Sequence, residues 1–237
     1  MIVNQSADAP AGRTDPAAAL EHLLTTRFSC RAFQDRQVPR PVVERLLTLA
    51  QRSASWCNTQ PWQVIVTSGE GTERLREAMS AHAREHGPEF DFDPPAEYRG
   101  VHRERRRATG WQLYEAVGIA RGDRAASARQ AEQNFRFFGA PHVAIVTTDA
   151  VHRVYGAVDG GLYVGTFLLA ARSLGLGAVA QAAPAGHAAL LRRHFAVPDD
   201  RKILVAIAFG YADTDHPVNG YRTARAPLDE VVTWVDE

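Results

Sequence analysis

The sequence RFSCRAF, at residues 27–33, places the strongest constraint on what this chain can form and bind. It follows a segment with helical periodicity but has no helical stripe of apolar residues itself, so we predict a loop. Side chains alternate along an extended segment, so Arg27, Ser29 and Arg31 should point to the same side. Two guanidinium groups and a hydroxyl group on one side suit a phosphate carried on a polar chain.

A second loop has the sequence SASWCNTQPW, at residues 53–62. It brings small polar residues, two amides and two indoles into one turn between a predicted helix and a predicted strand. Amide groups both donate and accept hydrogen bonds, which suits the edge of a heterocycle. The alternative is a purely structural Asx-type turn beside a buried tryptophan.

Apolar periodicity, prolines and glycines predict alternating helices and strands around these loops, which indicates a mixed α/β or α+β domain. The segment 155–174 is apolar on most faces, so we expect it to be buried in the core or against a partner subunit. Residues 88–124 give the least regular pattern. The predicted helices are 16–26, 41–50, 72–85, 125–138, 155–174 and 188–195, and the predicted strands are 62–67, 143–147, 176–180 and 203–209.

The composition excludes several classes of protein. The 27 basic and 27 acidic residues balance, which argues against a general nucleic-acid binder. The two cysteines, Cys30 and Cys57, are too few for a disulfide scaffold and indicate a reducing compartment, so we predict a cytoplasmic protein. We expect Cys57 to be a small apolar filler. We expect residues 1–15 to form a disordered tail, and no segment has the pattern of a signal peptide or a membrane span.

Two further motifs are weaker. The residues from His82 to His86 match the H-x-x-E-H pattern of inverted zinc peptidases, but no third ligand can be placed, so we favour a solvated helix end and predict no metal site.

The second weak motif is a basic run formed by Arg103, Arg105, Arg106 and Arg107. Because Glu104 lies within it, we favour a solvated helix face. The alternative is a gate that attracts an anionic substrate or a dinucleotide phosphate.

Together the two loops resemble the FMN-dependent nitroreductase family. Proteins of that family typically begin with an arginine-x-serine-x-arginine (or lysine) loop and later carry a small-residue, Asn-x-Gln-Pro-Trp turn. The same order is found here. The resemblance continues at Asn134, at 139–141, at 165–169, at 175–177 and at Asn219, Arg222 and Arg225, and covers about residues 20–230.

The resemblance implies a set of residues that bind FMN. Arg27 and Ser29 match the positions that hold the phosphate and the ribityl chain. Arg31 matches a cation beside the pyrimidine side of the ring, where a fixed positive charge favours reduction.

The second loop matches a turn that reaches the cofactor from the partner subunit. Ser55, Trp56, Asn58 and Gln60 belong to this turn. Trp56 and Cys57 replace smaller residues that are often found there, which leaves the shape of the pocket open.

The remaining matches lie later in the chain. Asn134 matches an amide that hydrogen-bonds the ring edge, and Ala182 and Ala183 match backbone N–H groups that face ring atoms N5 and O4. Arg222 and Arg225 match the C-terminal contacts to the phosphate.

The family implies an α+β sandwich, with a central, mainly antiparallel sheet flanked by helices, in an intertwined homodimer with one FMN per subunit. Residues 16–237 would form a single flavin-binding domain with a variable cap at 88–124. The implied activity is ping-pong hydride transfer from NAD(P)H to a small nitroaromatic or quinone-type acceptor. The alternatives are a reductive dehalogenase, a flavin-fragmenting synthase, an oxidase or a non-catalytic flavin-binding protein.

Overall fold

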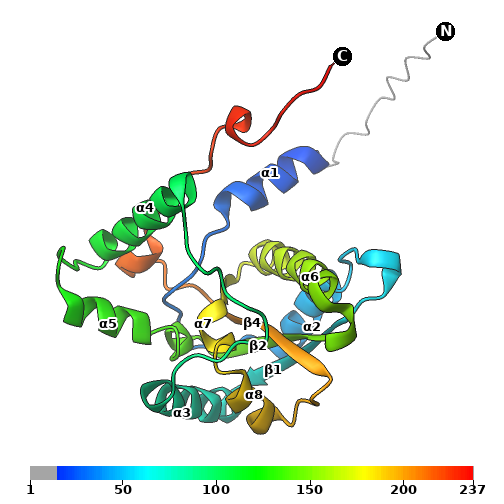
Figure 1. Ribbon diagram of the computed structural model, residues 1–237, viewed down its shortest axis with the longest axis vertical. Coiled ribbons are helices and arrows are strands. Elements are labelled where there is room, and N and C mark those ends of the chain that lie inside the picture. Colours follow the sequence, from blue (N-terminus) through cyan, green and yellow to red (C-terminus); the bar gives the residue numbers. More distant parts are fainter. Residues whose placement is uncertain (1–14, 237) are drawn as a thin grey trace.

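A four-stranded antiparallel sheet lies at the centre of the computed structural model, which describes residues 15–236 (Figure 1). The strand order is β1-β2-β4-β3. The strands are β1 Trp62–Ser68, β2 His142–Asp149, β3 Gly177–Gln181 and β4 Arg201–Gly210. The helices are α1 Pro16–Thr26, α2 Arg40–Ala50, α3 Glu70–Glu85, α4 Gly100–Ala116, α5 Arg124–Glu132, α6 Arg153–Ser173, α7 Ala182–Ala185 and α8 Ala188–Phe195.

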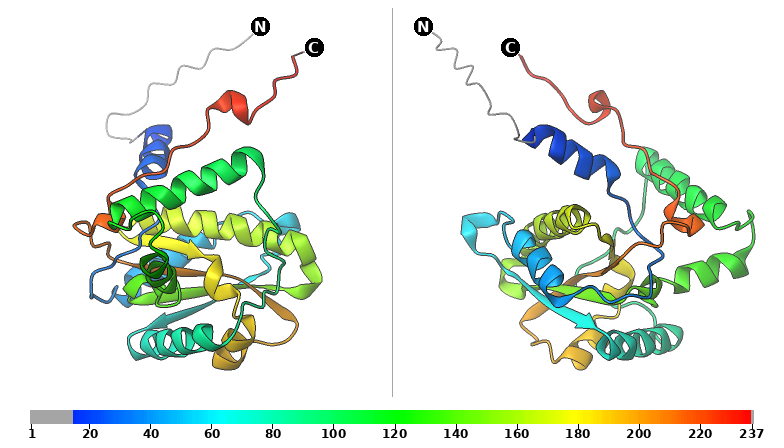
Figure 2. Two further views of the ribbon diagram at one scale, coloured as in Figure 1. Left: turned by 60° about the vertical axis from the view of Figure 1, so that its left-hand side comes forward. Right: turned by 180° about the vertical axis from the view of Figure 1, so that it is seen from behind.

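Helices cover both faces of the sheet, with α2 and α6 on one face and α3 and α8 on the other (Figure 2). This confirms the predicted α+β sandwich. The division into a tail and one domain with a cap stays a prediction. Of the predicted tail, only Asp15 is among the described residues, and its side chain caps α1 by accepting a hydrogen bond from the Ala17 N–H at 3.0 Å.

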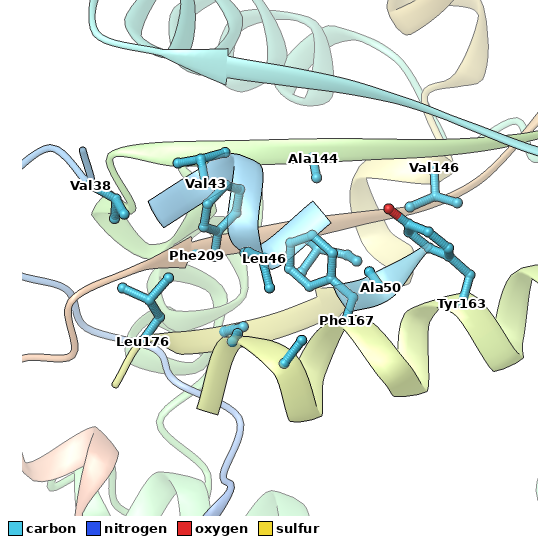
Figure 3. Packing of buried hydrophobic residues seen from close by; sticks show 14 of the residues in the cluster. Val38, Val43, Leu46, Ala50, Ala144, Val146, Tyr163, Phe167, Leu176 and Phe209 are labelled. Carbon is cyan, nitrogen blue, oxygen red and sulfur yellow. The ribbon is translucent and has the colours of Figure 1, made fainter. Parts of the chain in front are cut away.

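The central strand β2 is buried on both faces, so its alternate residues feed two separate cores. Ala144 and Val146 face α2 and α6, whereas Val143 and Ile145 face α3 and α8. The first core is shown in Figure 3, where the labelled side chains from α2, α6 and the sheet are Val43, Leu46, Ala50, Ala144, Val146, Tyr163, Phe167 and Phe209.

Two glycines bring α6 close to the sheet. A Cβ atom at Gly160 would lie 2.3 Å from Cδ1 of Leu204, and one at Gly156 would lie 2.6 Å from Oγ1 of Thr148. The opposite side of α6 is not covered, because the side chains of Tyr155 and Val158 are exposed. Burial of this helix on all sides within one chain is therefore excluded for the described residues 15–236.

One stretch of the described chain, Ala150–Ser173, is long and apolar enough to span a membrane by length and composition alone. Core helices of water-soluble domains pass the same test. Here the helix carries the buried carboxylate of Asp159, whose Oδ1 accepts a hydrogen bond from the Trp56 N–H at 3.1 Å, and Phe167 lies in the core. Its contacts make it a layer of the folded domain.

One prediction of secondary structure was incomplete and one was wrong. The helix face favoured for the basic run is confirmed, because Arg103, Arg105, Arg106 and Arg107 lie on α4, which has no buried residue. The bounds of this helix could not be recognised, since an exposed helix has no apolar stripe. The segment before α4 is also fixed, because Asp91 Oδ2 accepts hydrogen bonds from Arg192 Nη2 at 2.6 Å and from the Ile203 N–H at 2.7 Å. The helix predicted over 125–138 ends at Glu132, since buried Phe137 and Phe138 adopt positive φ angles.

A buried histidine joins β2 to the loop before α2. His142 Nδ1 donates to the Thr67 carbonyl at 3.1 Å, and its Nε2 accepts from the Val38 N–H at 2.9 Å. Both contacts together require the neutral imidazole. Burial lowers the pKa of His142 below its ordinary value, against the smaller opposite effect of the Thr67 hydrogen bond.

We therefore expect the free energy of unfolding to fall as the pH decreases below about 6.5, because the unfolded chain then binds a proton that folded His142 excludes. In the His142→Gln variant, the amide can replace both hydrogen bonds without titrating, so the fall should be smaller. Urea denaturation of both proteins at pH 7.5 and pH 5.5 measures this difference. Equal losses in the two proteins would assign the effect to other groups, such as His82 and His187, whose pKa values burial also lowers.

Candidate active site

The loop 27–33 lies along the edge of the sheet, beside β3. Ser29 and Ala178 form a parallel bridge, and the Cys30 N–H donates to the Ala178 carbonyl at 3.2 Å. Cys30 is fully buried against Gly177, where a Cβ atom would lie 2.8 Å from the Cys30 sulfur. Burial of Cys30 and Ala32 leaves the alternate residues on the other side, as the sequence predicts.

A single buried amide ties this loop to the C-terminal segment. Asn219 Oδ1 accepts from the Arg31 N–H at 2.8 Å, and Nδ2 donates to the carbonyls of Ala32 at 2.8 Å and Asp213 at 2.7 Å. Asn219 ends the short 3₁₀ helix Pro217–Asn219, so the residues that follow it are held next to the loop. This side chain therefore joins the loop 27–33 to the C-terminal segment.

The meeting of these segments forms a cavity of about 570 Å³. Thr109 of α4 and Tyr221 also line it, and Arg31 Nη1 donates to the Tyr221 hydroxyl at 3.1 Å. Five of the residues predicted to bind a cofactor line this cavity: Arg27, Ser29, Arg31, Arg222 and Arg225. The structure thus brings together the two groups of basic residues that are most distant in the sequence.

The cavity has an excess of positive charge. No aspartate or glutamate lines it, and no ion pair within residues 15–236 includes its four arginines. The pKa of Arg27 is lowered, mainly because burial disfavours the charged guanidinium and also because Arg225 repels it. Arg222 stacks on the Phe28 ring at 4.1 Å instead of meeting an acid. Such an arrangement can bind a phosphate group.

A second part of the predicted site lies at the start of α7. Gln181 Nε2 donates to the Asn134 carbonyl at 3.0 Å and to Asn134 Oδ1 at 3.4 Å, which holds Asn134 near the end of β3. The Gln181 Oε1 atom is buried without a hydrogen-bond partner. Ala182 and Ala183 open α7, where the first N–H groups have no acceptor within the helix.

The loop between α2 and β1 does not line this cavity in the same chain. The Ser55 hydroxyl accepts from the Gln60 N–H at 2.9 Å, and Asn58 Oδ1 accepts from Gln60 Nε2 at 3.1 Å. Trp56 is exposed and packs edge-on against Tyr155 of α6, with ring centroids 4.2 Å apart. These four predicted residues therefore form one rigid turn beside the exposed face of α6.

Cys57 in this turn is exposed and has a φ of 50°, so its interpretation as an apolar filler was wrong. The tight turn, with positive φ also at Asn58 and Gln60, turns the thiol towards solvent.

The two histidines of the H-x-x-E-H motif stack at 4.0 Å between ring centroids, and His187 lies 5.3 Å from His82. Within residues 15–236, no group of three or more histidine, cysteine or acidic residues is arranged to hold a metal ion. The zinc hypothesis gains no third ligand from the fold.

Several contributors to the site could not be identified as such from the sequence. Asn219 belongs to a recognised motif, but its three hydrogen bonds depend on the fold. Phe28, Tyr221 and Gln181 act through contacts with Arg222, Arg31 and Asn134. In the sequence, these residues are marked only by lying close to residues that were predicted to belong to the site.

Comparison with known proteins agrees with this geometry. The family model described as the nitroreductase family matches residues 24–211, which is most of the chain. The chain belongs to the nitroreductase family. Within the family, it is 40% identical over 229 residues to nitroreductase NfnB of Mycolicibacterium smegmatis, covering 95% of this chain and 97% of that protein.

A second relative and a solved structure of NfnB are also similar over nearly the whole chain. A 4-nitrobenzoate reductase of a Nocardioides species is 35% identical over 226 residues and covers 92% of each chain. The crystal structure of the FMN-dependent nitroreductase NfnB from Mycobacterium smegmatis in complex with NADPH superposes with a TM-score of 0.88 at 37% identity, over 93% of this chain and all of that chain.

We expect Asn219→Ala to lower the free energy of unfolding by about 2–4 kcal/mol, because it leaves the buried Arg31 N–H and two carbonyls without their partner. Urea denaturation gives the value, with Thr48→Ala on the exposed side of α2 as the control. If both variants unfold at the same urea concentration, Asn219 does not hold the two segments together.

Proposed function

We propose that this nitroreductase-family chain is an FMN-dependent oxidoreductase that uses NAD(P)H to reduce nitroaromatic or quinone-type acceptors. The observation that carries the proposal is the cavity in which Arg27, Arg31, Arg222 and Arg225 meet without an acidic residue. Two relatives, an FMN-dependent nitroreductase crystallised with NADPH and a 4-nitrobenzoate reductase, support it.

The residues present fit FMN. A dianionic phosphate offsets the mutual repulsion of Arg27 and Arg225, and Ser29 lies beside them for a polar chain. Asn134 and the unpaired, buried Gln181 Oε1 supply hydrogen-bonding groups for the edge of a heterocycle. We propose that Ala182 and Ala183 present their N–H groups to the ring.

Bound FMN would supply the two-electron chemistry, taking a hydride from NAD(P)H and passing it to the acceptor in turn. The chain's own groups position the cofactor and set its electrostatic surroundings. We propose that Arg31 places a fixed positive charge at the pyrimidine side of the ring, where it stabilises negative charge that arrives during reduction. The Tyr221 hydroxyl and the Asn219 side chain hold Arg31 in that position.

We further propose a homodimer. Val151, Val154, Tyr155, Val158 and Leu162 form one stripe along α6 and the turn before it, and each is between 49% and 75% exposed. A continuous stripe of exposed apolar side chains fits contact with a second copy of the chain. The turn with Ser55, Trp56, Asn58 and Gln60 adjoins this stripe, so the dimer would bring it to the cofactor of the other subunit. A cytoplasmic location also remains our proposal, supported by the two unpaired cysteines.

The function is tested by loading the purified protein with FMN and titrating it anaerobically with NADPH and with NADH. We expect the oxidised flavin absorbance to bleach and to return when 4-nitrobenzoate or a quinone is added.

Arg225→Ala should weaken FMN binding by about tenfold or more, because a charge-assisted contact to the phosphate is lost. Fluorescence titration of FMN measures this affinity.

Failure to bind FMN would overturn the proposal. A yellow protein that NAD(P)H does not bleach would favour the non-catalytic flavin-binding alternative. Bleaching without turnover of nitroaromatics or quinones would favour a dehalogenase, synthase or oxidase. An unchanged FMN affinity in Arg225→Ala would remove this arginine from the phosphate contacts.

The dimer is tested by Val158→Glu, which places a charge in the middle of the exposed stripe of α6. We expect a monomer with reduced FMN affinity, because the turn from the second copy is lost. Light scattering coupled to size-exclusion chromatography measures the mass, with Arg84→Glu on the exposed side of α3 as the control. A wild-type monomer that binds FMN fully would contradict the proposed assembly.

A further inference from the structure

A second cavity lies next to the proposed FMN cavity, under the C-terminal half of α4. Its volume is about 380 Å³, within the range of small-molecule sites. Arg31, Tyr221 and Thr109 line both cavities, so the second one opens directly beside the residue that we place at the pyrimidine side of the ring.

The lining combines two kinds of group. Trp111 and Tyr114 of α4 form an edge-to-face pair with ring centroids 6.0 Å apart, and with Tyr221 they give the cavity aromatic walls. Arg106 and Arg107 from the preceding turn of α4 add two guanidinium groups. The cavity therefore suits a flat ring that carries a negative charge.

The charges of these two arginines are not neutralised. No acidic residue lines the cavity, and neither Arg106 nor Arg107 takes part in an ion pair within residues 15–236. Arg106 instead lies over the Tyr98 ring, 5.1 Å from its centroid. Their neighbour Arg105 differs, because it bonds Glu230 at 2.6 Å and does not line this cavity. Of the four arginines in the basic run, Arg105 is thus paired with Glu230, whereas Arg106 and Arg107 remain available in this cavity.

We propose that Arg106 and Arg107 form a carboxylate-binding subsite that selects aromatic acceptors carrying an acidic group. The inference rests on the proposed function and deepens it. A guanidinium group binds a carboxylate through two parallel hydrogen bonds, which also fixes the direction of the ring. The arginines hold the charged end of the acceptor, and the aromatic walls hold its ring with the opposite end towards Arg31.

The size and position of the cavity favour the acceptor over the reductant. In a benzoate, one ring separates the carboxylate from the group to be reduced, so both can lie within this single cavity. In NADPH, two riboses and a pyrophosphate separate the nicotinamide from the 2′-phosphate. Such a phosphate would reach a more distant surface than a cavity that shares Arg31 with the FMN site.

The test compares 4-nitrobenzoate with its uncharged methyl ester as acceptors for the FMN-loaded enzyme. In the double variant Arg106→Gln and Arg107→Gln, we expect kcat/KM for 4-nitrobenzoate to fall by about tenfold or more, since charge-assisted hydrogen bonds are lost. The value for the methyl ester should stay within about twofold. Arg105→Gln, which removes one positive charge from the same helix outside the cavity, should affect both acceptors equally and little.

The other outcomes each overturn the inference. Equal loss on both acceptors would mean that the arginines only support the fold, and no loss on either would mean that no carboxylate binds there. A loss seen with NADPH but not with NADH would assign the arginines to the phosphate of the reductant. Reduction of the ester by the wild type tests the proposed function independently of the carboxylate subsite. If the wild type reduces neither acceptor, the proposed function fails and the inference fails with it.

Discussion

The docking of one extended loop on the edge strand of the sheet is the contact on which the site depends. Cys30 inserts its side chain against Gly177, and its N–H bonds the Ala178 carbonyl. Because side chains alternate, burial of Cys30 turns the residues on either side of it towards the cavity. Asn219 then fixes the C-terminal segment to the same loop. Two buried residues, Cys30 and Asn219, thus set the positions of the arginines around the cavity, and the Asn219 carbonyl also accepts a hydrogen bond from Arg222 Nη1 at 2.7 Å.

The concentration of arginines has a cost in stability, because four positive charges share one cavity and Arg27 is partly removed from water. A bound anion relieves this repulsion, so we expect binding to stabilise the fold by mass action. The repulsion between these charges without a ligand therefore increases the affinity of the cavity for an anion. The arginines of α4 extend the same field towards the neighbouring cavity.

Helix α6 has apolar residues on two sides, one that packs on the sheet and one that is exposed. Its glycines let it approach β2 and β4 closely, while Tyr155 and Val158 face outwards. This explains why the segment is apolar on most faces although one chain covers only part of it. The Trp56 turn rests on the uncovered side, so assembly and completion of the proposed cofactor site would be coupled.

The sequence by itself determined the alternation of helices and strands, the loop that presents Arg27, Ser29 and Arg31, and the identity of the basic residues, because these depend on local periodicity and residue chemistry. It did not determine the bounds of α4 or the end of α5, since an exposed helix has no apolar stripe and no local pattern marks the positive φ angles of buried Phe137 and Phe138. The family resemblance implied that Arg27 and Arg225 lie on one phosphate, and both line one cavity. Only the tertiary structure decided that Arg106 and Arg107 face a second cavity while Arg105 pairs with Glu230. Contacts between residues so distant in the chain arise from packing, which no local pattern encodes.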